Sequence, residues 1–105
     1  MSEAPERLTV HIDDELVFLV SGELDAHTAP DLASALAGIS DDADVVLDFA
    51  GLSFMDSSGL RVIISTNSTL TAGGGSLVLR SPGRTVQRIL SVSGLEGHIS
   101  VVDAT

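Results

Sequence analysis

The sequence predicts an α/β fold in which helices pack on a mixed, largely parallel β-sheet. Two apolar segments, residues 8–12 and 16–20, are separated by an acidic turn and are typical of an opening hairpin. After them, segments with helical periodicity alternate with short apolar strands, as in parallel sheets built by crossover connections. The 105 residues, 44% of them apolar, are enough for one core. We therefore expect a single domain, residues 1–105.

The two opening strands differ in pattern. Residues 8–12 alternate apolar and polar side chains, which predicts a strand with one buried face. Residues 16–20 are apolar throughout, which predicts a strand buried on both faces and ending at Ser21 and Gly22. The acidic residues 13–15 provide the turn between them.

The first helix is expected over residues 29–39. Thr28 is a candidate N-cap, Pro30 suits the first turn, and Asp31 favours the positive end of the helix dipole. Residues 45–49 then form a short apolar strand, and residues 50–55 are expected to be a loop.

The remaining elements complete the order β-β-α-β-α-β-α-β. A second helix over residues 57–72 ends at the glycines 73–75, which look like a loose turn, and residues 76–80 form the next strand. Ser81 and Pro82 open a third helix that Gly94 ends, and residues 99–102 form the last strand.

Composition excludes several classes of function. The net charge is −10, and residues 1–56 contain 13 of the 15 acidic residues. Such a surface repels phosphates, so we expect no direct binding of nucleic acid or membrane. A basic protein partner fits this charge, although solubility alone would explain it. The lack of cysteine excludes disulfides and thiolate metal sites.

Other features point to the cytoplasm and to a protein without cofactors. No apolar segment is long enough to cross a membrane, and residues 1–7 are too acidic and polar for a secretory signal. His11, His27 and His98 lack the spacing of metal ligands.

Two segments that lead from a strand into a helix, residues 22–28 and 52–60, are the candidates for a site. In a parallel sheet both lie at the carboxyl ends of strands, so we expect them to be neighbours. Within the second, Asp56-Ser57-Ser58-Gly59 begins a helix, and capping is the simpler explanation of these residues. A hydroxyl at a helix start is nevertheless often exposed, and a phosphate there would be tolerated by the fold.

These two segments resemble the signature loops of STAS-domain anti-sigma factor antagonists. The most specific part is residues 54–60, Phe-Met-Asp-Ser-Ser-Gly-Leu, and residues 92–95, Val-Ser-Gly-Leu, add weaker support. The resemblance implies a STAS fold and a protein that binds an anti-sigma factor, itself a serine kinase, and thereby frees a sigma factor. It also implies that the kinase phosphorylates Ser57 and ends binding, and that a serine/threonine phosphatase reverses this.

The resemblance also implies roles for the neighbouring residues. We expect the partner-binding residues to be Asp25, Asp56, Ser58, Gly59 and Arg61. Asp56 orients the loop or contacts the partner, Ser58 is a cap rather than a phosphate acceptor, and Gly59 permits close backbone approach. Asp25 is either a partner contact on the facing loop or a turn residue. Arg61 pairs with Asp56 or a phosphate, or is solvated. Family members often have a second glycine at the position of Arg61, and a helix after the last strand, where this sequence ends.

Two other functions compete with this interpretation. A nucleophilic enzyme using Ser57 or Ser58 lacks both a Gly-x-Ser-x-Gly motif and a triad arrangement, so we expect no enzyme activity. A STAS subunit or scaffold of a transporter or stress-sensing complex remains as the alternative.

Overall fold

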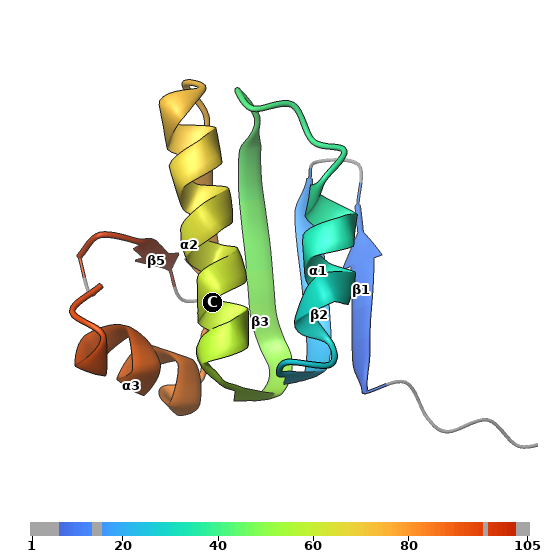
Figure 1. Ribbon diagram of the computed structural model, residues 1–105, viewed down its shortest axis with the longest axis vertical. Coiled ribbons are helices and arrows are strands. Elements are labelled where there is room, and N and C mark those ends of the chain that lie inside the picture. The colour runs from blue at the N-terminus through green and yellow to red at the C-terminus, as the bar shows by residue number, and fades with distance from the viewer. Residues whose placement is uncertain (1–6, 14–15, 96, 103–105) are drawn as a thin grey trace, which may run out of the picture.

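The computed structural model describes residues 7–13, 16–95 and 97–102, and it contains the expected order of elements (Figure 1). The strands and helices are β1 (Leu8–Ile12), β2 (Val17–Leu24), α1 (Ala29–Leu36), β3 (Asp44–Met55), α2 (Ser57–Ala72), β4 (Ser76–Arg80), α3 (Arg84–Val92) and β5 (Ser100–Val102). Most of the expected acidic turn and the polar start of the chain, residues 14–15 and 1–6, lie outside the described residues.

The sheet is mixed and largely parallel, as predicted, with strand order β1-β2-β3-β4-β5. β1 and β2 form the antiparallel hairpin, while β3, β4 and β5 each run parallel to the preceding strand. In Figure 1, α1 and α2 lie side by side in front of the strands, and α3 lies at the lower left. The carboxyl ends of β2 and β3 and the start of α2 therefore share the lower edge.

One core joins the sheet to all three helices. Its largest fully buried side chains come from β2, α1, β3, α2 and β4: Phe18, Val20, Leu24, Leu32, Val45, Leu47, Phe49, Met55, Ile63 and Leu79. α3 adds Val86 and Leu90, which lie on one face of the helix. The core is thus mainly aliphatic, with two phenylalanines within it.

The prediction of a loop at residues 50–55 is wrong, because β3 continues to Met55. β2 is correspondingly longer and pairs with this segment, Gly22 with Leu52 and Leu24 with Met55. Two register shifts interrupt the pairing, and such bulges break the period-two pattern that identifies a strand in sequence. The extension carries the second candidate segment to the edge of the sheet.

The prediction that residues 16–20 form a strand buried on both faces is wrong, because β2 is buried on one face only. Phe18 and Val20 point into the core, but Leu19 between them is 39% exposed. Successive side chains of a strand point to opposite faces, and α1 and α2 cover only one face of the sheet here (Figure 1). An apolar run therefore does not by itself establish two-sided burial.

Two helix boundaries differ from the predictions, and a third agrees with them. α1 ends at Leu36 rather than at residue 39, because Gly38 disfavours continuation of the helix. After Leu36, the backbone N–H groups of Ala37 and Ile39 donate to carbonyls only three residues earlier, those of Ser34 and Leu36, as in a 3₁₀ turn. α3 begins at Arg84 with Gly83 as N-cap, two residues after Pro82. α2 ends at Ala72 as predicted.

Two of the three glycines after α2, Gly73 and Gly75, are closely packed rather than loose, whereas Gly74, with a φ of +92°, has open space around it. A Cβ on Gly73 would lie 2.3 Å from the Asp41 carbonyl oxygen, and one on Gly75 would lie 2.0 Å from that of Ala43. Ser76 then donates its N–H to the same Ala43 oxygen at 3.0 Å. The glycines let two backbone segments meet at the end of the sheet opposite the candidate site.

Candidate functional site

The two candidate segments are neighbours, as expected from the parallel sheet. The last residues of β2 and β3 pair side by side, Glu23 with Phe54 and Leu24 with Met55. The Asp56 N–H donates to the Leu24 carbonyl at 3.1 Å, which joins the end of one segment to the start of the next helix. Residues 22–28 and 52–60 together form what we call the Ser57 edge.

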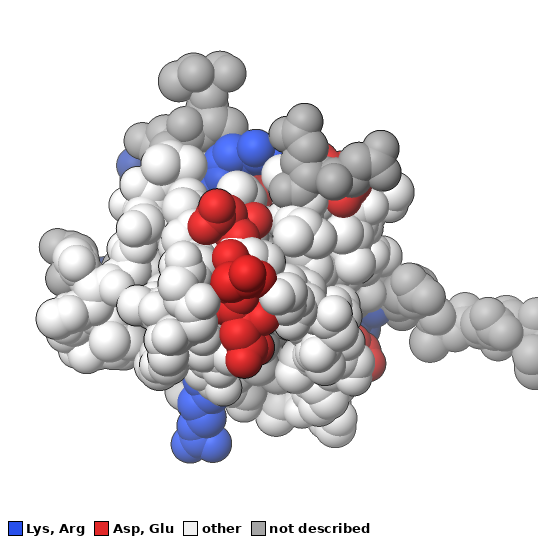
Figure 2. All heavy atoms as spheres, turned by 90° about the horizontal axis from the view of Figure 1, so that it is seen from above, with Lys and Arg blue, Asp and Glu red and all other residues white. Residues whose placement is uncertain are grey.

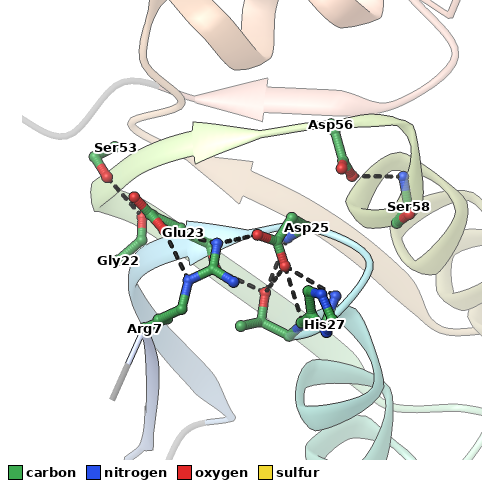
Figure 3. Close-up of polar contacts among 9 residues, drawn as sticks. Arg7, Gly22, Glu23, Asp25, His27, Ser53, Asp56 and Ser58 are labelled. Atoms are coloured by element: carbon green, nitrogen blue, oxygen red, sulfur yellow. Dashed lines mark hydrogen bonds and ion pairs between the residues drawn. The ribbon is translucent and has the colours of Figure 1, made fainter. Parts of the chain in front are cut away.

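Asp56 is the N-cap of α2, so the capping expected among residues 56–59 is present, but it comes from Asp56. Its backbone is extended, and its Oδ1 accepts the Ser58 backbone N–H at 2.8 Å (Figure 3). The expectation that Ser58 is the cap is wrong, because Ser58 donates to the cap and is itself half-buried. Ser57, the first residue of α2, is exposed.

Gly59 is buried in the first turn of α2 and faces the core. A Cβ at this position would lie 2.7 Å from Leu24 Cγ and from Met55 Cγ. The close approach expected of Gly59 is therefore an approach of α2 to the ends of β2 and β3. It fixes how Ser57 projects from the fold.

Arg61 lies one turn beyond Ser57 and is exposed. Within the described part of the chain it makes no ion pair with Asp56 or any other acid. Its side chain lines a groove of about 360 Å³ between α1 and α2, together with Asp41, Leu36 and Val62 among others. Of the alternatives for Arg61, the structure of the unmodified protein therefore shows an arginine exposed to solvent.

Asp25 organises the turn that leads from β2 into α1. Its Oδ1 accepts the backbone N–H groups of His27 at 2.9 Å and Thr28 at 3.2 Å, while Oδ2 accepts from Arg7 Nη2 (Figure 3). The side chain of Asp25 is only 15% exposed. The turn-residue interpretation of Asp25 is therefore confirmed, and a partner contact remains a prediction.

Thr28 occupies the N-cap position of α1, but its hydroxyl does not cap the helix. The hydroxyl donates to the Glu23 carbonyl at 2.7 Å and accepts the Asp25 N–H at 2.9 Å. The capping expected of Thr28 is replaced by Asp25, whose carbonyl accepts the Ala29 N–H at 2.7 Å. Hydrogen bonds thus close the turn on itself beside the start of α2.

Arg7 is the residue of this site that the sequence did not identify. Its Nε and Nη2 donate to Glu23 Oε1 at 2.9 and 2.8 Å, and Nη2 also pairs with Asp25. These hydrogen bonds raise the pKa of Arg7. The only available signal was that Arg7 is the single basic residue among the first 56.

The charge state of Asp25 follows from its neighbours. Desolvation of the carboxyl favours the neutral form, but hydrogen bonds from Arg7 and from two backbone N–H groups favour the carboxylate more strongly. The pKa of Asp25 therefore lies below its usual range. Asp25 is an anion throughout the physiological range.

Much of the acidic excess lies away from the Ser57 edge. Figure 2 views the molecule from the top of Figure 1, the opposite end, and shows acidic side chains gathered across that face. The chain that joins α1 to β3 at this end contains the exposed Asp41 and Asp42, and β3 begins there with the exposed Asp44. At the Ser57 edge, by contrast, Arg7 pairs with two of the carboxylates.

Phe54 adds an apolar group to the Ser57 edge. It lies three residues before Ser57, pairs across strands with Glu23, and is 45% exposed. The sequence marked Phe54 only as part of a motif, because exposure of one aromatic residue cannot be seen in a run of mixed polarity.

No cluster of metal-ligating side chains occurs among the residues described, and no helix formed by them is long and apolar enough to cross a membrane. The chemistry that the Ser57 edge offers is an exposed hydroxyl flanked by a capping carboxylate, an ion-paired turn and an exposed aromatic ring. This combination suits recognition of another protein.

Comparisons with known proteins identify the same region of sequence and fold. The family model described as "STAS domain" matches residues 6–105. An anti-sigma-B factor antagonist of Listeria monocytogenes is 35% identical over 101 residues, 94% of this chain and 85% of the relative. An anti-sigma factor antagonist from Mycobacterium paratuberculosis superimposes with a TM-score of 0.77 at 29% identity, covering 96% of this chain and 90% of that one.

The Bacillus protein SpoIIAA has been solved in two forms. Its unphosphorylated form matches with a TM-score of 0.70 at 27% identity, covering 93% of this chain and 88% of that one. Its phosphorylated form also gives 0.70, at 26% identity, covering 93% and 91%. This chain is thus equally similar to both forms.

Proposed function

The chain belongs to the STAS domain family, and from this premise we propose that it is an anti-sigma factor antagonist switched by phosphorylation of Ser57. Unphosphorylated, it binds an anti-sigma factor that is also a serine kinase, and a sigma factor is released. Phosphorylation ends binding, and a serine/threonine phosphatase restores it. The protein acts as a binding module and a kinase substrate in the cytoplasm, not as a catalyst.

The exposed Ser57 directly after the capping Asp56 is the observation that carries this proposal. A kinase must reach the acceptor hydroxyl, and the first residue of a 16-residue helix at the edge of the sheet is reachable. The positive end of the helix dipole also favours an added phosphate. Ser58 is half-buried, which makes it the poorer acceptor.

Switching by charge requires little change in fold. A phosphate brings nearly two negative charges to an edge that already carries Asp56, Asp25 and Glu23. Opposite one acidic group of the partner about 5 Å away, it costs roughly 1.5–6 kcal/mol depending on local screening. Both the unphosphorylated and the phosphorylated form of SpoIIAA share the fold of this chain, each with a TM-score of 0.70, which fits a switch that keeps this fold.

Phosphosite mapping tests the proposal. The chain is incubated with ATP, Mg²⁺ and each purified anti-sigma factor kinase of the genome that encodes it, and the products are analysed by mass spectrometry. We expect one kinase to add a single phosphate at Ser57, to modify Ser58→Ala normally and to leave Ser57→Ala unmodified. Modification of Ser57→Ala to the same extent, or co-purification with a transporter ATPase in place of an anti-sigma factor, would overturn it.

A further inference from the structure

We propose that Arg7 is a positioning residue of the partner-binding surface: its guanidinium holds the Asp25 turn in the conformation that the anti-sigma factor recognises. This inference rests on the proposed function. It assigns Asp25 an indirect role, because the carboxylate of Asp25 is engaged within the molecule.

The backbone of Arg7 is fixed to the end of β2. The Glu23 N–H donates to the Arg7 carbonyl at 2.7 Å. Gly22 has a φ of +107°, and a Cβ there would lie 2.0 Å from the Arg7 carbonyl oxygen, so glycine alone permits this contact. The backbone of Arg7 is therefore held in place, and its side chain extends from there along the Ser57 edge.

The guanidinium joins two acidic side chains that lie two residues apart. Both its Nε and Nη2 bond Glu23, and Nη2 also reaches Asp25 (Figure 3). Arginine suits this task because its planar donors engage two acceptors at once. A lysine offers one ammonium group and would retain only part of the arrangement.

Asp25 transmits this order to the turn. Its Oδ1 bonds the N–H groups of His27 and Thr28, and its Oδ2 bonds Arg7. Without Arg7, Oδ2 loses its cationic partner, and Glu23 and Asp25 face one another as like charges. The Asp25 carboxylate is then better solvated when it turns toward water, and in that orientation it no longer accepts the two backbone N–H groups of the turn.

The turn lies directly against the candidate trigger. Leu24, the residue before Asp25, accepts the Asp56 N–H at 3.1 Å and contacts the first turn of α2 at Gly59. A partner that binds at Ser57 therefore also contacts the Asp25 turn, which lies on the same surface. Arg7 sets both the shape of that surface and its charge.

The test compares Arg7→Ala and Arg7→Lys with Arg88→Ala, which removes an equal charge from an exposed position on α3. The probe is the anti-sigma factor kinase that phosphorylates the wild-type chain. We expect Arg7→Ala to weaken its binding about 3- to 10-fold, the range for losing two exposed ion pairs, with Arg7→Lys intermediate and Arg88→Ala unchanged.

Measurements on the free protein separate positioning from general stability. By NMR, Arg7→Ala should raise the pKa of Asp25 and shift the amide signals of His27 and Thr28, leaving those of α3 unchanged. In a double-mutant cycle with Asp25→Asn, the losses in affinity should be less than additive. Additive losses, or an Arg7→Ala affinity equal to that of Arg88→Ala, would overturn the inference.

The inference and the proposed function fail in different ways. If no anti-sigma kinase binds or modifies the wild-type chain at Ser57, the proposed function is wrong. If the wild-type chain binds and is modified at Ser57, but Arg7→Ala retains full affinity and an unshifted turn, only the role of Arg7 is wrong. Should Arg7→Ala fail to fold, Asp25→Asn with Arg7 intact gives the same comparison of turn signals and affinity.

Discussion

Adding one methyl group at Gly59 measures how firmly packing fixes the first turn of α2. The new Cβ would lie 2.7 Å from Leu24 Cγ and Cδ2 and from Met55 Cγ. Carbon atoms pack at about 3.5–4.0 Å, so α2 and the two side chains must separate by roughly 1 Å. Leu24 and Met55 are 0% and 1% exposed, so neither side chain can turn into solvent to relieve the contact.

The magnitude follows from two opposing effects. Overpacking of this kind costs about 1–3 kcal/mol, while replacing glycine in a helix returns at most about 0.5–1 kcal/mol. Because the contacts of 2.7 Å are closer than real Cβ atoms show, the cost of overpacking lies in the upper part of its range, about 2–3 kcal/mol. The net loss is then about 1–2.5 kcal/mol, which for a domain of this size lowers Tm by roughly 4–20 °C.

Thermal unfolding monitored by circular dichroism provides the assay. Gly38→Ala is the matched control, because a Cβ at Gly38 meets nothing within 4 Å. We expect the control to stay within a few degrees of the wild type. A Gly59→Ala protein as stable as the wild type would refute the conclusion that Gly59 is required by the contact of α2 with Leu24 and Met55.

Three further predictions concern the Ser57 edge. Asp56→Ala removes the cap on Ser58 and should cost about 1 kcal/mol, seen as a Tm about 4–8 °C lower, whereas Asp56→Asn should retain most of the stability. Phe54→Ala should weaken binding of the anti-sigma kinase about 5- to 30-fold in calorimetry while leaving Tm nearly unchanged, and unaltered affinity would exclude Phe54 from the interface. Because the pKa of Asp25 is lower in the folded than in the unfolded chain, its stabilising effect is present above about pH 4 and is lost as the pH falls through the folded pKa. Denaturant unfolding between pH 5 and 2.5 should accordingly show a shallower loss of stability for Asp25→Asn than for the wild type, and parallel curves would contradict the ion-paired state.

The fold was predictable because its signals are local. The apolar segments and helix signals specify the order of elements, and parallel pairing then brings the two candidate segments to one edge. What failed were features that depend on partners across the sheet. The continuation of β3 to Met55 relies on pairing with β2 through two irregularities, and the exposure of Leu19 depends on which face the helices cover.

The candidate site was predictable to a similar depth. Asp56 and Ser57 could be placed because a cap and the residue after it have a fixed relation to a helix start. The close approach at Gly59 was predicted, but the side chain that it meets was not, since Leu24 lies 35 positions away in the sequence. Arg7 was not identified, since its role arises from Glu23 and Asp25. That Arg7 is the single arginine or lysine in the acidic residues 1–56 does not by itself indicate which carboxylates it pairs with.

The central claim is that a phosphate on Ser57 abolishes binding without unfolding the protein. The direct measurement is the Kd of the anti-sigma kinase for the unmodified chain and for the chain fully phosphorylated at Ser57, with Tm recorded for both. The electrostatic cost of roughly 1.5–6 kcal/mol predicts an affinity about one to four decades lower for the phosphorylated chain, at a nearly unchanged Tm. Equal affinities, or a loss of affinity that accompanies unfolding, would contradict the account.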